Sequence, residues 1–194
     1  FVRAELAHDG IDTSALFIDP AGTSRSVNLM YRDGRRKNFY DGKSHMQLEP
    51  DPARCRSVLA ATRLAHFNLP NWARRLLPIA KELGVTVACD LQDVVTLRDG
   101  YREDFIAHAD IVFFSAVNQA GPASLIGELL DWKPDMIVVS GMGARGCALG
   151  TREGIRYFDP VSMDAPVIDT NGGSPRIIYF RDLTELGRGF EVPR

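Results

Sequence analysis

The sequence has few cysteines, no long apolar run and no excess of charge of either sign. Its three cysteines, Cys55, Cys89 and Cys147, are too few and too scattered for a disulfide framework, so we expect buried free thiols. The four histidines lack the spacing of metal ligands, which argues against a zinc site.

The charge balance and the short apolar runs exclude two further classes of protein. With 23 Lys and Arg against 25 Asp and Glu, the chain has no concentrated basic face for nucleic acid. The longest apolar run, residues 111–114, is typical of a buried strand and is too short to cross a bilayer. The N-terminal residues have no signal-peptide core and no starting Met. We therefore expect a cytoplasmic protein that binds neither nucleic acid nor membrane.

The first forty residues predict a helix followed by a small antiparallel sheet. Residues 1–9 have helical spacing and end at Gly10, which suggests the last turns of a helix that begins upstream. Apolar residues then follow a period of two, which predicts strands at 16–18, 26–31 and 37–40. Asp33-Gly34 between the last two strands is a strong hairpin signal, because Gly tolerates the positive φ of a tight turn.

After Pro50 the pattern alternates between helix and strand. It predicts helices at 54–61, 72–83, 103–108 and 122–132, and strands at 64–67, 85–90, 111–114 and 136–140. A hairpin is expected from strands at 148–149 and 155–158. Short apolar strands separated by amphipathic helices predict a doubly wound α/β core, a mostly parallel sheet with helices on both faces.

A glycine-rich stretch follows the strand that ends at Ser140. Gly141, Gly143 and Gly146 spell G-x-G-x-x-G at the carboxyl end of a parallel strand, where open α/β sheets bind ligands. A dinucleotide fingerprint needs a helix directly afterwards, but residues 147–150 have the character of a strand. The glycines therefore either let the backbone approach a nucleotide or simply close a turn between strands.

A second candidate segment follows an apolar strand end near residue 168. Asn171, Gly172 and Gly173 can form an anion-binding nest of backbone N–H groups, while Asp169 and Thr170 offer oxygens to a cation. The alternative is an Asx-type turn between strands.

Both segments, in this order, resemble the signature of PfkB-type, ribokinase-like carbohydrate kinases. In that family a strand leads to a Gly-x-x-Gly loop at the nucleotide, and a D-T-x-G-A-G-D motif follows about two dozen residues later. Residues 10–14 resemble the stretch after the family's second helix, and 16–40 resemble its lid over the sugar. Residues 87–92 resemble a segment that carries Asp and Asn in many members, and 109–112 lead into an N-x-x-E motif. The resemblance spans residues 1–173.

Three departures from the family pattern stand out. Neutral Ser115 and Asn118 occupy the magnesium-associated N-x-x-E motif, and Pro175 replaces the Asp that serves as the family's catalytic base. At this second motif, residues 176–180 also favour a strand where the family has a helix. The third departure is that the chain begins after the point where the family has supplied its first strands. We interpret the chain as a subset of a longer protein, without an N-terminal portion and a segment between Gly173 and Ser174. A naturally truncated, inactive relative is the alternative.

The resemblance implies a division of the chain and a set of site residues. The parts are the end of a core helix with a link to the lid (1–14), a β lid (15–48), an α/β nucleotide-binding core (49–173) and a C-terminal tail (174–194). An anion hole at Asn171, Gly172 and Gly173 is implied, with nucleotide contacts at Ser115, Asn118, Ser140, Gly141, Gly143 and Gly146, substrate contacts at Asp90 and Gln92, and a cation at Asp169 and Thr170.

The implied activity is transfer of a phosphoryl group from ATP to a small-molecule sugar or nucleoside, with Mg²⁺ and a monovalent cation such as K⁺ as cofactors. A homodimer through the lid is also implied. Two rival functions remain: a pseudokinase that binds nucleotide or sugar without turnover, and a nicotinamide-dependent oxidoreductase based on the literal G-x-G-x-x-G motif.

Overall fold

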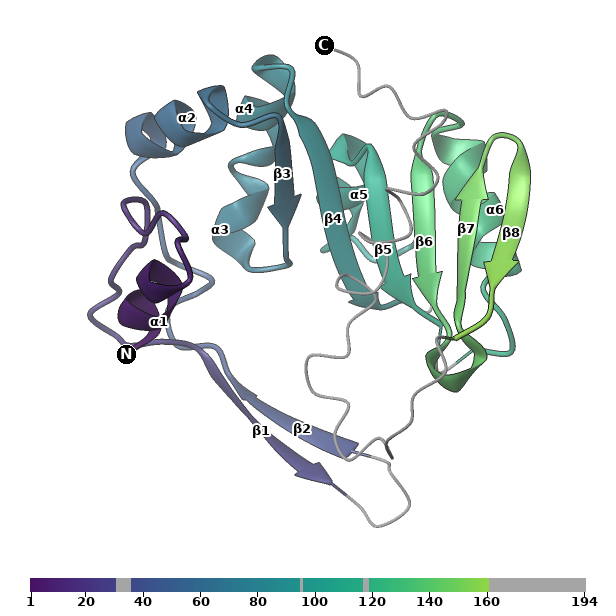
Figure 1. Ribbon diagram of the computed structural model, residues 1–194, viewed down its shortest axis with the longest axis horizontal. Helices are drawn as coiled ribbons and strands as arrows, with labels where there is room; N and C mark the ends of the chain where they lie inside the picture. The colour runs from purple at the N-terminus through teal and green to yellow at the C-terminus, as the bar shows by residue number, and fades with distance from the viewer. Residues whose placement is uncertain (31–35, 95, 117–118, 161–194) are drawn as a thin grey trace. The chain divides into compact units, whose positions relative to one another are not determined.

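The computed structural model describes residues 1–30, 36–94, 96–116 and 119–160 (Figure 1). The chain divides into two compact units. The first unit contains Phe1–Ala65 and Leu69–Val85, and the second contains His66–Asn68 and the chain from Thr86 onward. Among the described residues, no helix has the length and apolar character needed to span a membrane.

The first unit combines four helices with a two-stranded antiparallel sheet. Its helices are α1 (Val2–His8), α2 (Pro52–Ala60), α3 (Asn71–Arg74) and α4 (Leu77–Glu82), and its strands are β1 (Arg25–Met30) and β2 (Arg36–Asp41). The pairing of β1 with β2 confirms the predicted hairpin. Helix α2 contacts α4. Arg56 of α2 forms a bidentate ion pair with Glu82 of α4, in which Nη1 donates to Oε2 at 2.9 Å and Nη2 to Oε1 at 2.7 Å.

Two predictions for this unit were wrong. Residues 16–18 form no strand and pair with none of the described strands, and Asp19 folds the segment that follows into a turn by accepting the Ala21 N–H at 2.9 Å and the Ser44 hydroxyl. The predicted helix 72–83 is divided into α3 and α4. Pro78 explains the division, because proline lacks an N–H and is tolerated only in the first turn of a helix.

The second unit is built on a six-stranded sheet with the order β3-β4-β5-β6-β7-β8. The strands are β3 (Leu64–Phe67), whose last two residues belong to this unit, β4 (Thr86–Asp93), β5 (Ile111–Ser115), β6 (Ile137–Gly141), β7 (Cys147–Thr151) and β8 (Gly154–Phe158). Strands β4, β5 and β6 are parallel, whereas β7 and β8 continue the sheet as the predicted antiparallel hairpin. The fold is therefore the expected mostly parallel α/β sheet.

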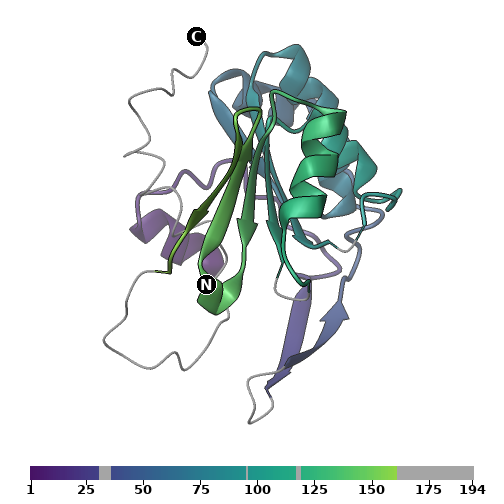
Figure 2. The ribbon, with the colours of Figure 1, turned by 90° about the vertical axis from the view of Figure 1, so that its right-hand side faces the viewer.

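Helices α5 (Glu103–His108) and α6 (Ala123–Trp132) lie on the same face of this sheet (Figure 2). Helix α6 packs so closely on β7 that a Cβ on Gly150 would lie 2.2 Å from the Ile126 Cγ2. The opposite face carries a cluster of buried residues centred on Phe113: Ala88, Ile111, Val139 and Cys147. The sheet therefore packs against helices on one face, and on the other its own apolar side chains form a buried cluster.

Gly150→Ala should reduce the free energy of unfolding by about 2 kcal/mol, because the added methyl overpacks the contact with α6. Ile126→Ala alone should cost about 3 kcal/mol through the cavity it leaves. Since the alanine methyl at position 150 would enter that cavity, the double variant should be more stable than the sum of the two losses predicts. Chemical denaturation of the four proteins measures this coupling, and strict additivity would contradict the packing.

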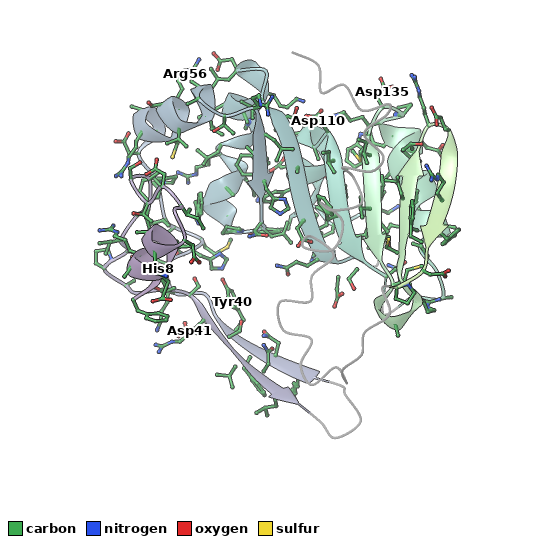
Figure 3. The ribbon with its side chains drawn as sticks, in the orientation of Figure 1. His8, Tyr40, Asp41, Arg56, Asp110 and Asp135 are labelled. Carbon is green, nitrogen blue, oxygen red and sulfur yellow. The ribbon has the colours of Figure 1, made fainter. Side chains whose placement is uncertain are left out.

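A polar cluster fixes the amino-terminal edge of the three parallel strands, where Figure 3 shows Asp110. The Asp110 carboxylate accepts the Val87 N–H at 2.9 Å, and Lys133 donates to Asp110 at 3.2 Å and to the Ala109 carbonyl at 2.5 Å. The Ile137 N–H donates to the Asp110 carbonyl at 2.9 Å. These contacts align the starts of β4, β5 and β6, so their carboxyl ends also lie together.

Candidate functional site

Three residues that could contact a ligand, Asp93, Ser115 and Gly141, lie side by side at the carboxyl ends of β4, β5 and β6. Ser115 at the end of β5 pairs with Asp93 of β4 on one side and with Gly141 of β6 on the other. The Ala116 N–H donates to the Gly141 carbonyl at 2.8 Å, which keeps β5 and β6 together to their last residues. This is the edge at which open α/β sheets bind ligands.

The glycine-rich stretch forms a tight turn at this edge. A short 3₁₀ helix, η1 (Gly143–Arg145), is closed by hydrogen bonds from Met142 N to Gly146 O at 2.9 Å and from Gly146 N to Gly143 O at 3.0 Å. Strand β7 follows the turn directly, so the helix that a dinucleotide fingerprint requires is absent from this place. The oxidoreductase interpretation thereby loses its structural basis.

Gly146 has a clear structural reason to be glycine. Its φ of +83° and ψ of −132° are accessible almost only to glycine, and a Cβ there would lie 2.0 Å from the Phe158 carbonyl oxygen. Gly146 therefore closes the turn between β6 and β7, one of the two roles that its sequence allowed. Gly143 also has a left-handed backbone conformation, with a φ of +60°. Because neither Gly143 nor Gly146 has a side chain, a ligand at this edge could approach their backbone closely.

Ser140 lies one residue before this turn, and its side chain is fully buried. Its hydroxyl has no hydrogen-bond partner among the described residues. A ligand at the edge would therefore meet the backbone of Ser140 rather than its hydroxyl.

Strand β4 ends in an irregular segment that contains the two residues expected to contact substrate. Asp90 is buried, and its carboxylate accepts the Gln92 N–H at 2.9 Å. The register of β4 against β5 shifts between Asp90 and Asp93, and Gln92 adopts a positive φ of 59°. Gln92 is exposed, so its amide side chain is available to a ligand.

Side chains also tie the loops that follow the three strands. The Gln119 amide, after β5, donates to the Val94 carbonyl after β4. The Arg145 guanidinium, in η1 after β6, donates to the Ala120 carbonyl at 3.3 Å. No sequence pattern predicts these two hydrogen bonds, because each joins a side chain to a backbone carbonyl 25 positions away.

The structure thus brings together Ser115, Ser140, Gly141, Gly143 and Gly146, with Asp90 and Gln92 on the neighbouring strand. Asn118 and the segment Asp169, Thr170, Asn171, Gly172 and Gly173 lie outside the described residues, as does the predicted tail from residue 174. Asp93, at the same edge as Ser115, was not predicted as a site residue.

A separate cavity of about 300 Å³ lies in the first unit and involves none of the predicted site residues. It is lined by Glu49, Pro50, Asp51, Pro52, Arg75, Leu76 and Ile79. Within the described parts of the chain, no group of three or more His, Cys, Asp or Glu side chains could hold a metal ion.

All three cysteines are buried and reduced, as expected. Desolvation raises the pKa of the Cys89 thiol to about 12, and the nearby Asp110 charge adds to this effect. Burial likewise raises the pKa of Cys55. Because only the thiolate reacts, we expect the native protein to react with a disulfide reagent at about pH 8 at least a hundredfold more slowly than the unfolded protein. Rapid labelling of Cys89 in the native protein would contradict this prediction.

The architecture is that of the ribokinase-like kinases. Ribokinase from Cryptococcus neoformans in complex with ADP superimposes with a TM-score of 0.72 at 18% identity, covering 88% of this chain and 61% of that one. A microbiome-derived acarbose kinase superimposes with a TM-score of 0.74 at 30% identity, covering 88% of this chain and 58% of that one.

In sequence, the chain is 30% identical over 180 residues to an acarbose 7(IV)-phosphotransferase from Actinoplanes sp., covering 91% of this chain. These matches confirm the resemblance to PfkB-type carbohydrate kinases, although no family model matches the chain. The chain spans about 60% of the length of this curated relative.

Proposed function

We propose that the protein containing this chain is an ATP-dependent sugar kinase. The observation that supports this function best is the alignment of Asp93, Ser115 and Gly141 beside the Gly143–Gly146 turn, on a ribokinase-like fold. In the proposed reaction an acceptor hydroxyl oxygen forms a bond to the γ-phosphorus, the bond to the ADP oxygen breaks, and the hydroxyl proton is released.

Phosphoryl transfer requires mainly positioning of the two substrates and stabilisation of charge. The bare backbone at Gly141, Gly143 and Gly146 would lie against the nucleotide, with Ser115 and Asn118 near its phosphates. The N–H groups of Asn171, Gly172 and Gly173 would stabilise the transferred group. Asp90 and Gln92 would hold the sugar acceptor.

Magnesium bound through phosphates needs only one or two carboxylates from a protein. Asp93, exposed at this edge, is a suitable residue for that purpose. Mg²⁺ would neutralise negative charge on the phosphates, and Asp169 with Thr170 would hold a monovalent cation such as K⁺. We place the protein in the cytoplasm, where buried cysteines outside disulfides, such as these three, are common.

The decisive experiment is a direct assay of ADP formation by the protein with its complete reading frame. Acarbose is the first acceptor to test because both relatives at 30% identity carry it in their names, and ribose and inosine should follow. Acceptor-dependent ADP formation is expected. If no acceptor supports turnover, the sugar-kinase function is wrong.

A pseudokinase is the second candidate, and Pro175 favours it because a prolyl ring cannot accept a proton. Neutral Ser115 and Asn118 point in the same direction. Thermal stabilisation by ATP or sugar without ADP formation would select this function. Binding of NAD more tightly than ATP would instead restore the oxidoreductase.

We also propose that the β1–β2 hairpin, as a lid, mediates a homodimer. Val27 and Phe39 are paired across the hairpin and are 59% and 50% exposed, and Leu29 on the same face is 52% exposed. Ser26, Asn28, Asn38 and Tyr40 occupy the other face, on which Asn38 donates to Asn28 at 2.7 Å. Arg25 and Asp41 lie at one end of this face and Lys37 at the other. An exposed apolar patch with a charged rim is typical of an interaction surface.

Phe39→Asp should convert the dimer into a monomer, because it would bury a charge in the apolar face. Light scattering after gel filtration measures the mass. Asn38→Asp, on the other face, is the matched control and should leave the dimer intact. A monomeric parent protein, or a variant that remains dimeric, would refute this interface.

A further inference from the structure

The backbone at Gln92 has a conformation that its own sequence does not favour. A positive φ costs a residue other than glycine about 1 kcal/mol or more, and the register shift between Asp90 and Asp93 removes regular pairing with β5 at this point. Contacts from elsewhere in the protein must therefore stabilise the segment.

Arg102 supplies these contacts from the start of α5. Its Nε donates to the Leu91 carbonyl at 3.0 Å, and its Nη2 lies 3.4 Å from the Asp93 carbonyl. These carbonyls belong to the residues immediately before and after Gln92. The Gln92 N–H is held by Asp90, so the backbone is fixed on both sides of the exposed side chain.

Asp99 holds Arg102 in place. Its carboxylate forms an ion pair with the Arg102 guanidinium and accepts the Tyr101 N–H at 2.9 Å. Burial alone would raise the Asp99 pKa, but the Tyr101 N–H and Arg102 outweigh burial and lower it. The ionised pair is therefore intact at neutral pH, and its contribution to stability is lost only as the pH falls below about 4.

We propose that Arg102 is a positioning residue that orients the exposed side chain of Gln92 toward the sugar acceptor, while Asp90 holds the Gln92 N–H from within the sheet. This inference rests on the proposed kinase function. Arg102 acts through the backbone of its neighbours and does not contact the substrate. Loss of Arg102 should therefore raise the KM for the acceptor more than the KM for ATP. The glycine turn, which we propose to bind ATP, follows another strand and does not depend on Arg102.

The test compares Arg102→Met, Arg102→Lys and Asp99→Asn with the parent in the complete protein. In Arg102→Met the KM for the acceptor should rise on the order of tenfold while the KM for ATP changes less than about twofold. Lysine keeps the charge but cannot donate to both carbonyls as a fork does, so Arg102→Lys should recover only part of the loss. Asp99→Asn should show a smaller effect in the same direction.

Arg56→Met is the matched control, because it also removes an arginine ion pair, here with Glu82 in the first unit. It should leave both KM values unchanged. Equal rises in the two KM values for Arg102→Met, or an acceptor KM equal to that of the parent, would overturn the proposal.

Hydrogen exchange gives a readout that does not depend on catalysis. The backbone N–H of Gln92 should exchange about tenfold faster in Arg102→Met, less than tenfold faster in the milder Asp99→Asn, and at the parent rate in Arg56→Met. Unchanged exchange in both Arg102→Met and Asp99→Asn would refute the positioning role. If exchange accelerates but no acceptor supports ADP formation in the parent, the proposed kinase function fails while the structural role of Arg102 stands.

Discussion

Gly146→Ala is expected to destabilise the protein by about 4 kcal/mol and to abolish nucleotide binding. The new Cβ would lie 2.0 Å from the Phe158 carbonyl oxygen and 2.9 Å from Pro160 N, both backbone atoms that cannot rotate away. The residue also needs a φ of +83° with a ψ of −132°. The turn must therefore open, which would move the glycine backbone away from the position that we propose for the nucleotide. Denaturant titration and calorimetric binding of ATP measure the two effects.

Gly154→Ala separates the clash from the backbone strain. Gly154 lies in the turn of the β7–β8 hairpin at φ +129°, and a methyl group added there would meet no heavy atom within 4 Å. In this variant the free energy of unfolding should fall by only about 1–2 kcal/mol, the cost of a positive φ for alanine, and the protein should still bind ATP. Equal losses in the two variants would show that the contact with Phe158 is unimportant.

Phe113→Ala should reduce the free energy of unfolding by about 4 kcal/mol, the second large effect. The Phe113 ring is 1% exposed, lies at the centre of the buried cluster and packs against His66 with ring centroids 5.7 Å apart. Strand β5 also carries Ser115 two residues later, so loosening Phe113 should disturb the candidate site. Chemical denaturation gives the loss of stability, and ATP titration gives the loss of affinity.

Tyr157→Ala is the control for removal of an aromatic ring from the same sheet. Tyr157 on β8 is 58% exposed, so its loss should cost less than about 1 kcal/mol. A loss at Phe113 no larger than the loss at Tyr157 would contradict the assignment of Phe113 to the core.

The parts of the fold that were predicted correctly are those with a strong local signal. Helix Glu103–His108 and the β7–β8 hairpin follow from spacing and turn residues within a dozen positions. The strand predicted at 16–18 was wrong because period-two alternation does not guarantee a partner strand, and Ile18 is 78% exposed. The division of helix 72–83 had a local signal in Pro78 that the apolar spacing concealed.

The candidate site was predictable in its residue types more than in its arrangement. Gly141, Gly143 and Gly146 stood out because they follow an apolar strand, and the structure places them at its carboxyl end. Asp93 carried no motif and became a candidate only through its pairing with Ser115. The burial of the Ser140 side chain could not be predicted, because it depends on neighbours from other strands.

The sequence by itself determined the alternation of strands and helices, the glycine turn and the resemblance to PfkB-type kinases, since all of these are properties of neighbouring residues. The tertiary structure alone decided which loops meet and which side chains hold them. Arg102 reaches carbonyls 9 and 11 positions earlier in the chain, and Ser115 is aligned with Gly141 by strand pairing. Backbone carbonyls are identical in every residue, so no local pattern marks the ones that a distant side chain will bind.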